Sequence, residues 1–575
     1  MIGQNIDVMS EFESPLPLPV MVIIVAVGIF AITIIHIIPH YSFKYIPESG
    51  IAMILGLIAG VILHWCPSDV TGSFKFDTSI FYSILLPIIV FECGYSVKKR
   101  YFFHGPILSL ILIMAIFGTL IMVIVCFFLL YPFSTKEDSP INQYELLLFS
   151  CSISAVDPVA TLGVYDTVKC GATLHHTIFG EAILNDAVVN ALILSIEETG
   201  EREESRETTE SISDNSTLDI SSYSIYNATN GQEDAVLTKP SSTTTIHLTG
   251  KDIGWLILRF IYSSLGAIAI GMVGACISSL FYKYVTVLQC RPEFEAFTVL
   301  LFAFIPYLCS SWCSFPGVMT SLATGIVMSH YTRYNLSQKG RTVLQRLLFL
   351  LAHFSELFIV FILGLGLVFT PSSQPVEDGM WNIGFICACI GAVLVSRMVA
   401  IAIIIPIVNI FRSKERRISF SMCGALWGAL MRGGISYALS LSISDGAESL
   451  YSVTTTVVCV FTTVIMGSLT YPMLKLFKIP TGVEWELEYV KQDGIGSVDR
   501  GARRLDRDIL KPFFVRDSEQ MRMERNELAN RRIRNITRTR RHTAREAFSR
   551  DVPTPLSHSR TSHQHSNGPI DYDGI

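Results

Sequence analysis

Residues 176–196 read H-T-I-F-G-E-A-I-L-N-D-A-V-V-N-A-L-I-L-S-I, an apolar run with Glu181, Asn185 and Asp186 at its centre. A second apolar run, residues 149–164, carries another acid. A charged side chain at the centre of a bilayer costs roughly 2.5–3.5 kcal/mol on insertion scales, so such residues face the interior of a helix bundle or a water-filled cavity. We therefore expect these acids to form an ion site inside a membrane protein.

The composition of the chain agrees with an all-α polytopic membrane protein. Half of its 575 residues are apolar, only 16% are charged, and the mean hydropathy is +0.46. Soluble classes do not show this profile over such a length. The 13 cysteines lie in or beside apolar runs and show no CxxC pair or metal-ligand spacing, so we expect no cofactor and no enzymatic activity.

The apolar runs predict about thirteen membrane-spanning helices within a transmembrane domain of residues 18–475. The predicted spans are 18–39, 49–65, 78–96, 106–131, 145–166, 175–196, 252–282, 296–312, 316–330, 347–370, 381–410, 419–444 and 451–475. A short extracellular or luminal segment, residues 1–17, precedes them, and a cytoplasmic tail, residues 476–575, follows.

The orientation follows from the distribution of Lys and Arg, which gather in one set of connecting loops. This set includes Lys98-Lys99-Arg100 and Arg412–Arg417, whereas the opposite loops are acidic or poor in bases. The alternation predicts an outer N-terminus and a cytoplasmic C-terminus. The outer loop 197–251 is rich in Ser, Thr and acids, which predicts disorder, and its sequons predict glycosylation at Asn215 and Asn227.

The tail becomes markedly basic from Asn530 to Arg545, a stretch with seven Arg and no acid. A cytoplasmic segment of this kind binds anionic lipid headgroups, with about 1 kcal/mol from each base near the surface. A solvated, partly disordered tail is the alternative. Nucleic acid is not an expected partner, because the tail is tethered to the membrane and shows no folded binding module.

Two positions predict breaks in helices at membrane depth. Pro158 removes a backbone donor, so the helix should unwind near Asp157, where carbonyls and the carboxylate together suit a cation. Nearby hydroxyls at Ser154 and Thr161 either add ligands or bond back to their own helix. Gly433-Gly434 predicts a second break. One broken helix in each half of a chain is typical of inverted-repeat transporters.

The acids of 176–196 point in different directions. Glu181 and Asn185 are four residues apart and share a helix face, whereas Asp186 lies about 140° around the helix from Glu181. Two roles are therefore implied. Asp186 with Asn185 is the better candidate for ion binding, and Glu181 needs a basic partner, for which Arg397 and Arg432 are available in other spans. A further intramembrane acid, in F-S-E-L-F-I-V-F at 354–361, has no assigned role.

Five segments resemble, in order, the hallmark segments of eukaryotic sodium/proton exchangers. They are L-L-P-I-I-V-F-E-C-G-Y-S at 85–96, A-V-D-P-V-A-T-L at 155–162, F-G-E-A-I-L-N-D-A-V at 179–188, G-I-V-M-S-H-Y-T-R-Y-N-L-S at 325–337 and M-R-G-G-I-S-Y-A-L-S-L at 431–441. The likeness covers about three quarters of the chain, from about Ile46 to residue 475. V-M-S-H-Y-T and the short tail resemble the endomembrane, Golgi-type branch.

The resemblance implies an inverted-repeat antiporter fold of thirteen spans with two broken crossing helices, a homodimer and an elevator-like movement. It implies electroneutral exchange of Na+ or K+ for H+, by alternating access, in a Golgi, endosomal or plasma membrane, for pH and cation homeostasis. Asp186 is implied as the ion- and proton-binding acid, with Asn185 and Asp157 beside it. An Asn before this Asp is the pattern associated with one-for-one exchange.

The resemblance also implies supporting roles. Glu181 would form a structural ion pair with Arg397, and Arg432, with Pro158 and Gly433, would support the broken helices. The chain departs from the family pattern in three places, of which Ala182 bears on the ion site because the family usually has Ser there. Leu86-Pro87-Ile88 replaces the usual Pro-Pro, and L-C-S-S-W-C-S at 308–314 lacks an acid that relatives often carry.

Three other functions are compatible with intramembrane acids. A transport-inactive pH or ion sensor would keep the exchanger fold, and Ala182 favours it. A passive cation channel is less compatible, because isolated acids on broken helices suit alternating access better than a pore ring. An intramembrane aspartyl protease is disfavoured, because Tyr165-Asp166 lies at a helix end and no G-x-G-D occurs.

Overall fold

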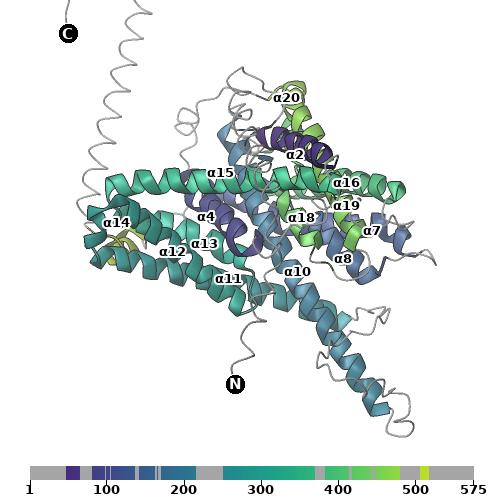
Figure 1. Cartoon of the computed structure of the whole chain (residues 1–575), viewed down its shortest axis with the longest axis horizontal. Helices are drawn as coiled ribbons and strands as arrows, with labels where there is room; N and C mark the ends of the chain where they lie inside the picture. The colour runs from purple at the N-terminus through teal and green to yellow at the C-terminus, as the bar shows by residue number, and fades with distance from the viewer. Residues whose placement is uncertain are drawn as a thin grey trace, which may run out of the picture. The chain divides into compact units, whose positions relative to one another are not determined.

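The computed structural model describes eleven stretches of the chain and a few single positions between them. The stretches are 47–64, 81–97, 99–103, 105–135, 141–158, 170–214, 250–369, 382–413, 417–441, 448–479 and 506–516. Within them every regular element is a helix (Figure 1), which confirms the all-α class. The predicted span 18–39 and both sequons, Asn215 and Asn227, lie outside the described residues.

The helices of the first half follow the apolar runs. They are α2 (Glu48–His64), α4 (Leu86–Ser96) with a π-helical turn before it (Phe81–Leu85), α5 (Lys99–Phe102), α6 (Gly105–Ile113), α7 (Thr119–Ser134), α8 (Gln143–Ser152) and α10 (Ala172–Asp214). A π-helical turn, Met114–Gly118, joins α6 to α7 into one continuous helical stretch.

The described part of the second half contains three long helices and several shorter ones. They are α11 (Gly250–Tyr284), α12 (Pro292–Trp312), α13 (Gly317–His330), α14 (Thr332–Asn335), α15 (Gln338–Phe369), α16 (Ile383–Ile410), α17 (Phe420–Gly428), α18 (Gly434–Leu441), α19 (Glu448–Val460), α20 (Gly467–Leu476) and α23 (Lys511–Phe514). The three long ones are α11, α15 and α16.

Seven helical stretches of the described chain are long and apolar enough to cross a membrane. They are Gly105–Ser134, Thr173–Gly200, Gly254–Tyr284, Pro292–Trp312, Gln338–Val368, Ile383–Ile410 and Leu450–Leu476. Two shorter apolar helices, α2 and the stretch Phe81–Ser96, occupy two more of the predicted spans. A total of thirteen spans stays a prediction.

Two helices are broken where the sequence predicts. After α8 ends at Ser152, residues 153–157 are not helical, and between α17 and α18 residues 429–433 are not helical either. The two breaks meet, because the backbone N–H of Asp157 donates to the carbonyl of Met431 at 2.9 Å. Unwound backbone is tolerated at membrane depth only inside protein or along a cavity, so this crossing marks the interior of the bundle.

The helix α10 is longer than the sequence predicts. It continues to Asp214, whereas the interpretation of 197–251 as a disordered loop begins at Glu197. That interpretation is wrong up to Asp214. The acid-rich extension contains no Pro and many Glu and Arg, which are good helix formers, and an ion pair of Glu198 with Arg259 at 2.5 Å joins it to α11.

The helices α2 and α15 lie side by side and run in the same direction (Figure 1). Gly56 of α2 faces the backbone of Phe361, and Gly364 of α15 faces the backbone of Met53. A side chain at either glycine would collide with the opposite backbone, so the two glycines allow a close approach. This contact places Glu48, the first residue of α2, beside the middle of α15.

A segment of the tail docks on the bundle at the junction of α13 and α14 (Figure 1). We call residues 506–515 the tail strap. One oxygen of Asp506 lies 3.0 Å from Nε2 of His330 and accepts a hydrogen bond of 3.0 Å from the hydroxyl of Tyr331. Its other oxygen forms an ion pair of 2.9 Å with Nζ of Lys511, within the strap.

The far end of the tail strap is held by its backbone. Lys283, near the end of α11, donates to the carbonyls of Pro512 at 2.9 Å and Phe513 at 2.7 Å. Asn335, which ends α14, donates to the carbonyl of Phe514 at 2.8 Å. The strap therefore ties α11 to α14.

Candidate functional site

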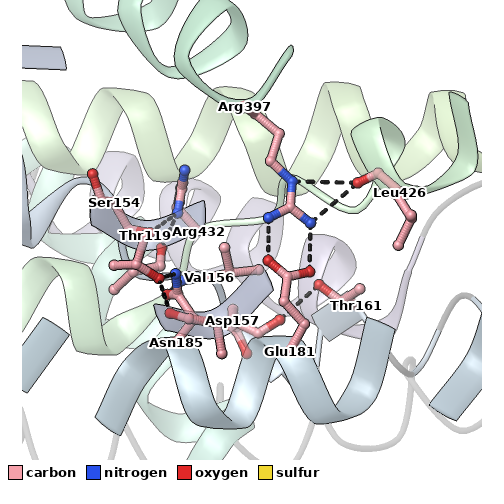
Figure 2. A network of polar contacts seen from close by, with 12 residues as sticks. Thr119, Ser154, Val156, Asp157, Thr161, Glu181, Asn185, Arg397, Leu426 and Arg432 are labelled. Atoms are coloured by element: carbon pink, nitrogen blue, oxygen red, sulfur yellow. Dashed lines mark hydrogen bonds and ion pairs between the residues drawn. The ribbon is translucent and has the colours of Figure 1, made fainter. Parts of the chain in front are cut away.

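Asn185 links α10 to the first helix break. Its amide oxygen accepts a hydrogen bond from the backbone N–H of Val156 at 2.9 Å, and its amide nitrogen donates to the hydroxyl of Thr119 on α7 at 2.7 Å (Figure 2). The Asn185 side chain is fully buried. Buried amides of this kind need partners for both ends, so Asn185 holds the break, α7 and α10 in one arrangement.

Asp186 is the next residue on α10 and has a different environment. It is 2% exposed, and neither carboxylate oxygen has a hydrogen-bond partner among the described residues. The N–H of Val156, which approaches Asp186, donates to Asn185 instead. A buried carboxylate without donors is strongly destabilised as an anion. Asp186 therefore needs either a proton or a cation.

A small cavity lies between the two helix breaks, α4, α10 and α15. Its volume is about 30 Å³, enough for a water molecule or a monovalent cation. The acids that line it are Asp157, Asp186 and Glu356. Pro158 and Gly433, one from each break, line it as well. A site with several carboxylates and little space suits a small cation.

Gly433 is required at this place by packing. A Cβ atom built on Gly433 would collide with the carboxylate of Asp157, because the two residues face each other across the crossing. The carboxylate of Asp157 also accepts a hydrogen bond from the N–H of Ala160 at 3.3 Å. The second break thus leaves room for the acid of the first, which the sequence indicated only as a helix-weakening Gly pair.

Arg432 occupies the carbonyls that the first break exposes. Its Nη1 donates to the carbonyl of Ser154 at 2.6 Å and also to that of Ala155. The backbone of Arg432 is itself held, since its N–H donates to the hydroxyl of Thr462 at 3.2 Å and its carbonyl accepts from Thr463 at 2.7 Å. The carbonyls of Ser154 and Ala155 are therefore satisfied by a cationic side chain, so the carboxylates that line the cavity are the groups left to bind a cation.

The two hydroxyls considered as extra ligands bond within their own segment. Ser154 donates to the carbonyl of Ser150 at 2.7 Å, and Thr161 donates to the carbonyl of Asp157 at 2.6 Å. Of the two alternatives left open by the sequence, the structure therefore shows local bonding. Ala182 is buried but does not line the cavity.

Glu181 lies away from the cavity and forms a two-pronged ion pair with Arg397 of α16 (Figure 2). Nη2 of Arg397 donates to Oε2 of Glu181 at 2.6 Å, Nη1 donates to Oε1, and Nε donates to the carbonyl of Leu426 at 3.3 Å. All three partners are buried. The pair joins α10, α16 and α17 into one unit.

The sequence found Glu356 as an intramembrane acid but gave it no role. The structure places it on the wall of the cavity that the helix breaks also line. Its helix, α15, is far from α10 in the sequence, so no local spacing relates Glu356 to Asp186. Only its position in an apolar run signalled a special environment.

Comparison with known proteins gives a consistent result. The family described as "Sodium/hydrogen exchanger, transmembrane" matches residues 24–476. The chain is 28% identical to sodium/hydrogen exchanger 8 of Mus musculus, covering 84% of this chain and 81% of that protein. It is 25% identical to sodium/hydrogen exchanger 5 of Arabidopsis thaliana, covering 83% and 82%.

A solved structure shares the fold. The sodium proton antiporter MjNhaP1 from Methanocaldococcus jannaschii, at pH 8, matches with a TM-score of 0.52 and 17% identity, covering 80% of this chain and 99% of that one. The family match spans most of the chain, including both helix breaks and the acids at their crossing. The protein belongs to the sodium/hydrogen exchanger family.

Proposed function

We propose that this protein exchanges Na+, or K+, for H+ one-for-one by alternating access, with Asp186 as the shared binding group. The observation that carries the proposal is the buried carboxylate of Asp186, which has no hydrogen-bond donor among the described residues and faces a cavity of about 30 Å³. Asp157 adds a second carboxylate to this cavity. The family match and the relatives' names support exchange of Na+ and H+.

The mechanism is competition between a proton and a cation for one carboxylate. A proton on Asp186 neutralises it, and a bound cation offsets its charge, so either loaded state can cross the low-dielectric barrier. The empty carboxylate is a buried charge without hydrogen-bond donors among the described residues, offset only in part by Arg432, which is unfavourable. Asp186 therefore moves only when loaded. The two loaded states have the same net charge, so a complete cycle moves no net charge.

The ion pair Glu181–Arg397 supports the moving unit. Because it joins α10 to α16 and α17, these helices move with Asp186 as one body. Arg432 and Asn185 preserve the geometry of the two crossing helix breaks during the movement, since both bind the backbone of the first break.

The remaining features of the proposal concern the surroundings of the transporter. The spans support a multi-pass membrane protein. We propose a homodimer in a Golgi, endosomal or plasma membrane, a cytoplasmic tail whose Arg-rich part binds anionic lipids, and glycosylation at Asn215 and Asn227. Exchange in such membranes would serve pH and cation homeostasis.

The test is proton flux in proteoliposomes on addition of Na+, K+ or Li+, for wild type and Asp186→Asn. We expect cation-driven flux that is lost in the variant and is unchanged when the membrane potential is clamped. Asp508→Asn is the matched control, because Asp508 is exposed in the tail strap, and it should retain wild-type flux.

Other outcomes favour the other functions. Current that follows the potential would indicate a channel. Absence of flux from folded wild-type protein would favour the sensor. Flux that persists in Asp186→Asn would show that another carboxylate binds the ions.

A further inference from the structure

We propose that Glu48, His353 and Glu356 form a proton relay between the surface of the protein and the ion cavity. The inference rests on the proposed function, since it concerns how protons reach Asp186. Three titratable side chains from α2 and α15 lie in a row that ends at the cavity wall.

The row is ordered by exposure. The Glu48 side chain is 46% exposed, that of His353 is 31% exposed and that of Glu356 is 8% exposed. The row therefore runs from a half-exposed carboxyl group to a nearly buried one. The inner end, Glu356, shares the cavity with Asp157 and Asp186.

The distances connect consecutive members. Nε2 of His353 lies 3.5 Å from Oε2 of Glu48, and Nδ1 of His353 lies 3.9 Å from Oε2 of Glu356, one helical turn further along α15. Both separations are ion-pair distances, and a small side-chain rotation shortens them to hydrogen bonds. Groups that transfer protons are commonly this loose before the active state forms.

An imidazole is the side chain suited to the middle position. Its two nitrogens face two different carboxylates, so one nitrogen can accept a proton while the other donates one. The ring of Phe349 stacks on it, with centroids 5.5 Å apart and planes 8° apart. This stacking holds the imidazole in one plane, and a half-turn of the ring about the Cβ–Cγ bond keeps that plane.

Each transfer moves one proton and changes no bond between heavy atoms. A proton passes from the Glu48 carboxyl to Nε2 of His353, which makes the imidazole a cation. The proton on Nδ1 then moves to the Glu356 carboxylate, and a turn of the ring restores the first tautomer. From Glu356 the proton crosses the cavity to Asp186. The reverse sequence releases it.

Acidic groups surround the inner end of the relay. The carboxylates of Asp157, Glu48 and Glu92 act electrostatically on Glu356, and Cys93 of α4 lines the same cavity. The α18 and α19 side chains packed on this part of α15 include Tyr437 and Cys459.

The experiment compares two fluxes in proteoliposomes that carry wild type or His353→Phe. One is cation-driven proton flux, and the other is exchange of labelled against unlabelled cation, which needs no proton. Phe fills the space and can stack on Phe349 but carries no proton. We expect proton flux to fall at least about tenfold, since a positioned proton-transfer group contributes roughly 10²–10⁴-fold, while labelled-cation exchange stays at the wild-type rate.

Glu356→Gln should also lower cation-driven proton flux, because it removes the inner carboxyl group of the relay. His330→Phe is the matched control, because it removes an imidazole that contacts the tail strap and not the cavity, and both of its fluxes should match wild type. Equal loss of both fluxes in His353→Phe would show a packing role and overturn the relay, and so would wild-type proton flux. Absence of proton flux in wild type would instead overturn the proposed function.

Discussion

The buried ion pair Glu181–Arg397 shows how individual side chains contribute to the stability of this helix bundle. Both side chains are about 1% exposed, and each satisfies the other through two hydrogen bonds. Taking two charges out of water is costly, and the pair is tolerated because the geometry is two-pronged and Leu426 accepts a further bond from the Arg. Removal of one partner leaves the other charged and buried.

Glu181→Gln should therefore lower the free energy of unfolding by about 3–5 kcal/mol. The measurement is thermal unfolding of the purified protein in detergent. The double variant Glu181→Leu with Arg397→Met is the control, because it removes both charges and should be less destabilised than the single variant. A single variant as stable as wild type would contradict the assigned role of the pair.

Helical geometry predicted part of this site from the sequence alone. The angle of about 140° between Glu181 and Asp186 predicts different roles for the two acids. In the structure Glu181 pairs with Arg397, and Asp186 lines the cavity. The partner of Glu181 did not follow from spacing, because Arg397 and Arg432 were both intramembrane bases. Contacts between residues hundreds of positions apart are not encoded in a local pattern, and for the same reason Glu356 received no role.

At the scale of elements, Pro158 and Gly433-Gly434 predicted both broken helices, because these residues disfavour the α-helix locally. The end of α10 was predicted too early, because a polar composition indicates exposure to water but does not end a helix. The tail strap was not predicted. Its docking depends on single contacts, such as that of Asp506 with His330. A pattern of apolar residues along the sequence does not predict such contacts.

The short helix α5 provides a pH-dependent prediction. Burial, with the charges of Arg333 and Lys511 nearby, lowers the pKa of Lys99 from 10.5 to about 7, against a smaller opposing effect of Asp506. The protonated Lys99 is thus disfavoured in the folded state. The cost is fully present below pH 7 and decreases as the pH rises toward 10.5, where the unfolded chain also loses the proton.

Lys99→Gln should consequently raise the melting temperature most at about pH 6, below the lowered pKa. Its advantage over wild type should decrease between about pH 7 and about pH 10. The measurement is a series of thermal unfolding curves across this range. An advantage that is constant with pH would contradict the assigned ionisation of Lys99.

At the scale of the whole molecule, the tail strap, residues 506–515, belongs to the same compact unit as the helices. Burial acts to raise the pKa of Asp506, but hydrogen bonds from His330 and Lys511 outweigh it and hold that pKa below its usual range. The ionised carboxylate therefore favours docking at pH above about 4, the ordinary Asp value, and this contribution is lost as the pH falls below it. At neutral pH the docked form is stabilised.

Truncation after Leu505 should expose the junction of α13 and α14, because Tyr331 and Asn335 lose their contacts with the tail strap. We expect faster amide hydrogen exchange there and a lower melting temperature. Truncation after Arg516 is the matched control, since it keeps every strap contact described above. Equal exchange in the two truncated proteins would show that the strap does not hold the junction.

The length of α10 has a mechanical consequence. The helix has 43 residues, and the part from Ser195 to Asp214 extends roughly 28 Å at 1.5 Å per residue. Asp186 lies on the same continuous rod. A displacement of the part of α10 that carries this carboxylate also moves the last turns of the helix. A spectroscopic label near Asp214 would report a displacement of the part of α10 that carries Asp186.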